Sequence, residues 1–234
     1  MVLSDYLMYS WVCVMYMTSI DYLGPAPDNR ISSRPYLYEE ISRSSDTNIV
    51  PLSEFKHYLN IDFSDDDALL QAILLAAIRE VEQYCSIYLT ITDIKTYRDI
   101  FFDEQSLRGV VGEGREYMTL YRRPFVSITS VSYLNKENES ITIDPKTYYI
   151  QKTQDYAILA LAPGEKWPND VSPKLGSIAI EFKVGFQLVP SLLKLAIKQI
   201  GANYYSNRGD DSSDIMPIPK HCKTILNQFR RILI

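Results

Sequence analysis

Apolar residues between positions 65 and 86 recur every three and four residues, which is the spacing of an amphipathic helix. The main stripe consists of Leu70, Ile73, Leu74, Ala77, Val81 and Tyr84, and it is widened by Leu69, Leu75, Ala76 and Ile78. Ser64 is a favourable N-cap, and the carboxylates of Asp65–Asp67 meet the positive end of the helix dipole. A stripe this wide predicts burial on two sides, which a second helix of the same chain and a neighbouring subunit could provide.

The pattern changes to alternation between residues 89 and 186, as expected for strands with one buried face. The clearest run alternates apolar positions with small or charged ones, and its apolar members are Ile178, Ile180, Phe182, Val184 and Phe186. We therefore expect an antiparallel sheet or small barrel of about six or seven strands. The stretch Asp103–Glu116 contains three glycines and mixed charge, and it is expected to be a mobile loop.

Helical spacing returns after Pro190, which suits a helix start because proline lacks the N–H that would be unpaired there. The predicted helix covers 190–208, and a shorter one is predicted over 52–59. Together these elements predict an α+β fold. Its helical part uses the long helices 65–86 and 190–208, and an antiparallel β module (89–186) is inserted between them.

Both ends of the chain are predicted to be extended, with residues 1–50 as an N-terminal arm, 51–209 as the body and 210–234 as a C-terminal tail. Pro25, Pro27 and Pro35 disfavour regular structure in the arm. The apolar run Leu7–Ile20 is too short to span a bilayer, and no Lys or Arg precedes it, which disfavours a signal peptide. We expect this run to pack on the chain or on a partner, although a later start codon is the alternative.

Composition and charge narrow the function classes. Hydrophobic residues make up 46% of the chain and charged residues 23%, which excludes disorder throughout. The net charge of −5 argues against a general grip on nucleic acid, which needs clustered bases. Cys13, Cys85 and Cys222 lie far apart in the sequence, so neither a disulfide framework nor a zinc site is expected.

Sequence motifs of catalysis are missing, since neither GxxxxGK[ST] nor GxSxG occurs. Asp65–Asp67 could hold a divalent cation, but helix capping is the favoured interpretation. His57 and the adjacent His221 and Cys222 have no metal-binding or catalytic spacing, and Trp167 is interpreted as a core or interface plug. We therefore expect no enzyme, no catalytic residue, no metal and no cofactor.

Several short motifs between Pro51 and Gly209 together resemble the head–tail connector, or adaptor, proteins of tailed bacteriophages and related gene-transfer particles. The first motifs are a short opening helix, Leu52–Leu59, and a long helix carrying Asp65–Leu70 and Ala76–Cys85. The later ones follow in the family's order: Arg123–Tyr133, Asp144–Tyr149, Trp167–Pro168, Val184–Pro190 and Leu193–Arg208. Each motif is weak alone, and the resemblance rests on their order along the body.

The resemblance implies a structural virion protein that is made in the host cytoplasm and located at the portal vertex, or neck. Such proteins form a ring, usually a dodecamer, below the portal, where they extend the DNA channel and attach the tail. The implied partners are the portal protein, tail proteins (tail tube, stopper or nozzle) and neighbouring copies of the chain. Packaged DNA would pass without sequence-specific binding, which the acidic net charge suits, and no membrane is implied.

On this interpretation the two long helices build the ring wall and the tail docks on the portal. The residues expected at the subunit interface are Leu70, Ile73, Leu74, Ala77, Val81, Leu193, Ile197 and Tyr204. Those expected to bind the portal are Lys220, Lys223, Ile225, Phe229, Arg230, Arg231, Ile232 and Leu233. A solvated surface helix, or a nucleic-acid or membrane contact, are the alternatives for the tail.

The alternative for the whole protein comes from a different class. It is a monomeric, soluble β/α binding module for a small ligand or a protein, with a concave apolar pocket. A ring on a portal would favour the connector, whereas a monomer with a ligand would favour the module.

Overall fold

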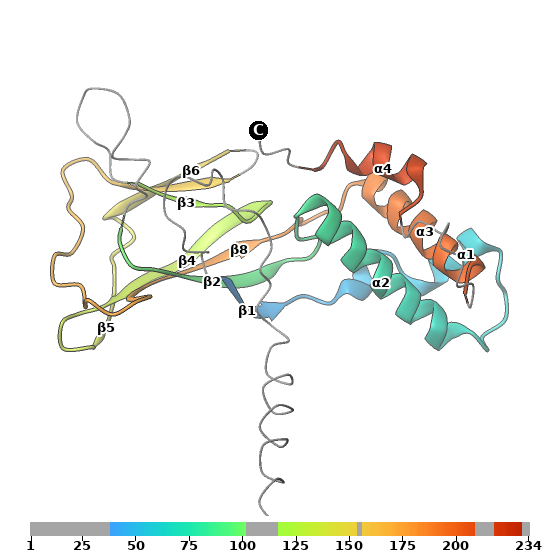
Figure 1. The fold of residues 1–234 in the computed structure, drawn as a ribbon, viewed down its shortest axis with the longest axis horizontal. Helices are drawn as coiled ribbons and strands as arrows, with labels where there is room; N and C mark the ends of the chain where they lie inside the picture. The colour runs from blue at the N-terminus through green and yellow to red at the C-terminus, as the bar shows by residue number, and fades with distance from the viewer. Residues whose placement is uncertain (1–37, 102–116, 154–155, 209–217, 231–234) are drawn as a thin grey trace, which may run out of the picture.

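The computed structural model describes residues 38–101, 117–153, 156–208 and 218–230. A β module and a layer of helices lie side by side along the long axis (Figure 1). The expected loop Asp103–Glu116, the apolar run Leu7–Ile20 and the predicted portal-binding residues Arg231, Ile232 and Leu233 lie outside the described residues.

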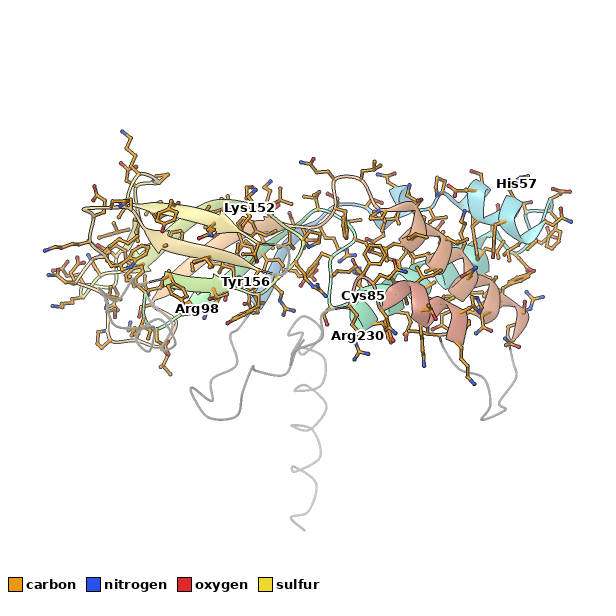
Figure 2. The ribbon with its side chains drawn as sticks, turned by 90° about the horizontal axis from the view of Figure 1, so that it is seen from above. His57, Cys85, Arg98, Lys152, Tyr156 and Arg230 are labelled. Atoms are coloured by element: carbon orange, nitrogen blue, oxygen red, sulfur yellow. The ribbon has the colours of Figure 1, made fainter. Side chains whose placement is uncertain are left out.

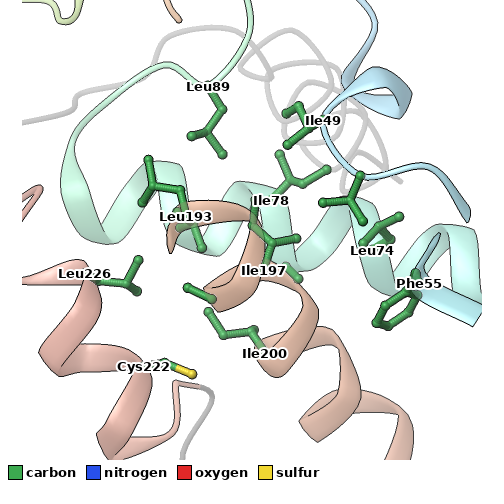
Figure 3. Packing of buried hydrophobic residues seen from close by; sticks show 14 of the residues in the cluster. Ile49, Phe55, Leu74, Ile78, Leu89, Leu193, Ile197, Ile200, Cys222 and Leu226 are labelled. Atoms are coloured by element: carbon green, nitrogen blue, oxygen red, sulfur yellow. The ribbon is translucent and has the colours of Figure 1, made fainter. Parts of the chain in front are cut away.

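The helical layer contains α1 (Leu52–Leu59), α2 (Asp67–Cys85), α3 (Ser191–Ser206) and α4 (Lys220–Leu226). Both α1 and α2 end at a residue with left-handed backbone, Asn60 and Ser86, whose N–H groups bond to carbonyls of the last turn. All four helices contribute to one apolar core (Figure 3), whose labelled helical members are Phe55, Leu74, Ile78, Leu193, Ile197, Ile200, Cys222 and Leu226. This layer is therefore a small helical unit with its own interior.

The β module consists of two sheets in which all paired strands of the described residues are antiparallel. One sheet has the order β1 (Tyr38–Arg43), β2 (Thr92–Arg98), β8 (Ile178–Val184), β4 (Phe125–Leu134), β5 (Ser140–Thr142). The other has the order β3 (Tyr117–Leu120), β7 (Ala157–Leu161), β6 (Tyr148–Lys152). Alternate residues of both sheets, including Ile180, Phe182, Met118 and Leu159, are fully buried in a second core. The module is thus a sandwich with a polar outer face.

The two parts are connected through β2 and β8, the strands that follow α2 and precede α3. Gly185 ends β8 with a φ of 114°, and a Cβ atom there would lie 2.0 Å from the carbonyl oxygen of Thr90. The Gly185 N–H donates to the carbonyl oxygen of Pro124 at 2.8 Å. Only glycine fits this crossing of three backbone segments, which fixes where the sheet meets the helices.

The predicted α+β fold and the insertion of strands between two long helices are confirmed. The helices predicted over 52–59, 65–86 and 190–208 correspond to α1, α2 and α3, and the described residues between 92 and 184 form seven strands. The end of the predicted N-terminal arm is wrong, because residues 38–43 pair with β2 as strand β1. Ile49 and Val50 are also buried in the helical core, so the folded body begins well before residue 51.

Candidate assembly surface

The described residues carry no arrangement suited to metal chemistry. Within the ranges that the structure describes, no group of three metal-ligating side chains occurs. In the same ranges, no helix is long and apolar enough to cross a bilayer.

Most residues expected at the subunit interface lie instead in the chain's own core. Six of them have at most 1% of their surface exposed: Leu70, Leu74, Ala77, Val81, Leu193 and Ile197. Ile73 and Tyr204 are half-buried against the same core. The expectation is corrected accordingly, because side chains packed between α2 and α3 cannot also contact another subunit.

The opposite face of α2 carries the exposed apolar stripe. Its members recur three and four residues apart and are Ala68, Leu69, Ala72, Leu75 and Ala76. Leu69 and Leu75 keep 41% and 37% of their surface exposed. We call these five residues the α2 outer stripe. It supplies the second apolar side that the sequence predicted.

A charged cluster borders this stripe at the C-terminal half of α2. Glu82 accepts hydrogen bonds from Arg43 and Arg79, at 2.8 and 3.1 Å, and Arg43 also donates to Asp46 at 2.8 Å. The same carboxylate accepts the backbone N–H of Leu89 at 2.7 Å. The cluster therefore ties β1 and the segment after it to α2 and to the start of the β module.

Neighbouring carboxylates favour the charged form of Arg43. Burial alone would lower the pKa of the Arg43 guanidinium, but the hydrogen bond to Asp46 and the attraction of Glu82 outweigh it and the pKa is raised. Only 13% of the Arg43 side chain and 9% of the Glu82 side chain are exposed. A pair this well shielded is screened little by salt.

The C-terminal segment is part of the helical core. Cys222 and Leu226 of α4 are fully buried, and Ile225 and Phe229 are half-buried against the same core. Ile225 and Phe229 therefore pack partly against the core of their own chain, and their insertion into portal grooves stays a prediction. Lys220 and Arg230 are exposed and Lys223 is partly so, which leaves these bases on the surface.

Arg123 joins the C-terminal segment to both parts of the protein. Its guanidinium donates to the carbonyl oxygens of Cys85 at 2.8 Å, of Phe229 at 2.9 Å and of Ser86 at 3.4 Å. The first two carbonyls belong to the end of α2 and to the turn after α4. A cation at a helix C-terminus is favourable because the dipole is negative there. Arg230 also lies over the ring of Tyr84, near Cys85, where the helices meet the β module (Figure 2).

Two further surface features stand apart from the α2 outer stripe. Leu188 and Leu192, at the connection from β8 to α3, are 81% and 43% exposed. At the far end of the β module, a hollow of about 300 Å³ is lined by aromatic, aliphatic and acidic residues, which are Asp99, Ile100, Phe101, Trp167, Pro168, Val171 and Ile178. Trp167 stacks on Phe101 with ring centroids 4.7 Å apart.

Sequence reasoning missed the Arg43–Glu82 pair and the role of Arg123. Their partners lie 39 and 106 positions away, and no local pattern predicts such contacts. One signal was available, because Glu82 interrupts the buried side of a helix that is otherwise apolar. A carboxylate in that position requires a cation nearby.

Comparisons with known proteins agree with this architecture. Residues 50–142 match the family described as phage gp6-like head–tail connector protein. A chain from the neck of an empty gene transfer agent particle, computed with C6 symmetry, is 19% identical with a TM-score of 0.63. A chain from the neck of the native particle, computed with C12 symmetry, is 20% identical with a TM-score of 0.60. In both cases the match covers 83% of this chain and 95% of the other.

These structural likenesses establish a shared fold across most of the chain. Among curated proteins, none matches the sequence. The family match covers α1, α2 and the strands β2 to β5. Over residues 50–142, the chain is similar to the phage gp6-like head–tail connector family.

Proposed function

We propose that this protein is a structural component of a virion neck, where it forms a ring below the portal, extends the DNA channel and attaches the tail. The family match and the fold shared with neck proteins solved under C6 and C12 symmetry support this role. The ring contains twelve copies, and the protein acts without catalysis.

The observation that carries the proposal is the α2 outer stripe. Leu69 and Leu75 are exposed beside three alanines, although the helix already buries a full apolar face inside its own chain. Exposed apolar surface of this kind marks a protein–protein contact. In the proposed ring, a neighbouring copy covers the stripe.

Portal docking falls to the bases left exposed at the C-terminal end. Lys220, Lys223 and Arg230 make no ion pair within the described ranges, so their charge is available to carboxylates of a partner. Arg231 follows directly as a further base, and Ile232 and Leu233 supply the apolar part of the contact. The docking region is thus the one predicted from the sequence, with Ile232 and Leu233 as its apolar anchors.

Electron microscopy of the purified protein mixed with its cognate portal tests the proposal. A ring stacked on the narrow end of the portal is expected, and a bare portal would overturn the connector role. Leu75→Glu should prevent the ring, whereas Leu175→Glu, on the exposed surface of the β module, should not. Lys220→Glu with Lys223→Glu should weaken portal binding, and the matched pair Lys166→Glu with Lys174→Glu should leave it intact.

The hollow beside Trp167 favours a second candidate, the monomeric binding module. Its volume of about 300 Å³ is at the lower end for small-molecule sites. A bare portal in the experiment above, together with a ligand-dependent change in Trp fluorescence, would favour this reading.

A further inference from the structure

We propose that the ring contact is head-to-tail, with the α2 outer stripe of one copy packed against the surface around Leu188 and Leu192 of the next. This inference rests on the proposed ring and specifies which two surfaces meet in it. The partner is a second copy of this chain.

The α2 outer stripe is shaped for close approach by another protein surface. Ala68, Ala72 and Ala76 follow at intervals of four, so their small side chains line one side of the exposed face. Leu69 and Leu75 project beside them as two larger anchors. A helix face of small residues flanked by leucines accommodates protruding apolar side chains from a partner.

The surface around Leu188 provides such protruding side chains. Leu188 is 81% exposed, more than any other large apolar residue in the described ranges, and Leu192 follows four positions later. The next residue, Leu193, is fully buried and faces the core with Ile197 (Figure 3). Leu192 therefore lies away from the side of α3 that packs on α2, and the two apolar surfaces are separate.

Two separate surfaces are what a ring requires. A two-fold dimer buries the same surface of both copies, and it would leave Leu188 and Leu192 in water. A head-to-tail contact buries one surface of each kind at every step, so closing the ring leaves neither exposed. The presence of both surfaces on one helical layer favours the head-to-tail arrangement.

The test uses two variants that each damage one surface, Leu75→Glu and Leu192→Glu. Each variant alone should self-associate at least about tenfold more weakly than the wild type, because every contact in the assembly contains one glutamate. An equimolar mixture retains one intact contact, between the stripe of the Leu192→Glu chain and the Leu192 surface of the Leu75→Glu chain. Sedimentation velocity of the mixture should show dimers and nothing larger.

Several results would overturn the pairing. One is a Leu192→Glu variant that assembles like the wild type. Another is a mixture that forms no dimers although the wild type assembles. A third is a Leu175→Glu control that fails to assemble. If the free wild-type chain stays monomeric at its highest soluble concentration, ring occupancy on the portal replaces sedimentation. Both variants must then leave the portal unfilled, and a full ring of Leu192→Glu chains overturns the pairing while the connector role stands.

Far-ultraviolet circular dichroism and urea unfolding of both variants check that the fold is kept. Leu75 and Leu192 are exposed, so their replacement should leave both signals at wild-type values. A portal that binds no wild-type protein would instead overturn the proposed function itself.

Discussion

Arg43 donates hydrogen bonds to both carboxylate oxygens of Glu82, each at 2.8 Å, across 39 positions of sequence. The pair connects the edge strand β1 to the helix that carries the α2 outer stripe. Both side chains are more than four-fifths buried, so neither charge has water as a substitute partner. Loss of this pair should therefore both release β1 and lower the stability of the helical layer.

Replacing Glu82 should destabilise the protein strongly. Glu82→Ala leaves Arg43 buried beside one remaining carboxylate and removes the acceptor of the Leu89 N–H, and we expect a loss of about 3 kcal/mol. Urea unfolding measures it. The matched control is Glu165→Ala at an exposed position, which should change stability by less than about 0.5 kcal/mol. Equal effects of the two substitutions would contradict a structural role for the pair.

Asp66 should contribute to stability in a pH-dependent way. It accepts the Tyr205 hydroxyl at 2.7 Å and Arg208 at 3.1 Å, and these hydrogen bonds, Tyr205 first, lower the pKa of Asp66 below its usual 3.8. Because the folded pKa is lower than the unfolded one, this stabilisation is present above the unfolded pKa and is lost as the pH falls through the folded value.

Tyr205→Phe should therefore raise the pKa of Asp66 and make the protein less sensitive to acid. Carboxyl chemical shifts followed by NMR report the pKa, and unfolding midpoints between about pH 5 and pH 2 report the stability. Tyr58→Phe is the control, since the exposed Tyr58 does not contact Asp66. An unchanged Asp66 titration in Tyr205→Phe would contradict the assignment.

Gly185 and Gly164 should respond differently to alanine. Both have positive φ, 114° and 86°, so each substitution carries backbone strain of about 1 kcal/mol. A Cβ at Gly185 would also lie 2.0 Å from the Thr90 carbonyl oxygen, whereas nothing lies within 4 Å of one at Gly164. Gly185→Ala should therefore unfold at a clearly lower temperature than Gly164→Ala in calorimetry. Equal melting temperatures would show that the crossing at Gly185 is loosely packed.

Removing a buried side chain of α4 should lower the stability of the fold. Leu226→Ala removes a fully buried side chain of the helical core, and we expect a loss of about 2–5 kcal/mol. Thr224→Ala, on the exposed side of α4, is the control and should cost little. Wild-type stability in Leu226→Ala would indicate that α4 leaves the core readily and is free to bind elsewhere.

The hydrophobic pattern predicted where helices and strands form, and it did so because periodicity depends on burial alone. It could not tell which apolar side of α2 belongs to the chain's own core. Leu70 and Leu74 look no different in sequence from Leu69 and Leu75, and only the position of α3 separates them. The same ambiguity applies to Phe229, whose partner turned out to be the chain itself.

Hydrogen bonds from a charged side chain to distant backbone could not be predicted from the sequence for another reason. The sequence assigns Arg123 no contact, because the carbonyl oxygens that it binds belong to backbone that every residue has. A hydrogen bond to a carbonyl leaves no trace in the identity of the accepting residue. Such contacts become visible only when distant segments are placed in space.

The central pair of strands also has a mechanical consequence. β2 begins and β8 ends on the side of the sheet nearest the helices, and Thr92 pairs with Val184 at that end. Tension between the two parts of the protein therefore pulls both strands in the same direction, and the ladder between them is not sheared. If the helical layer moves, β2 and β8 should therefore move with it as one rigid unit, up to their far end beside Trp167.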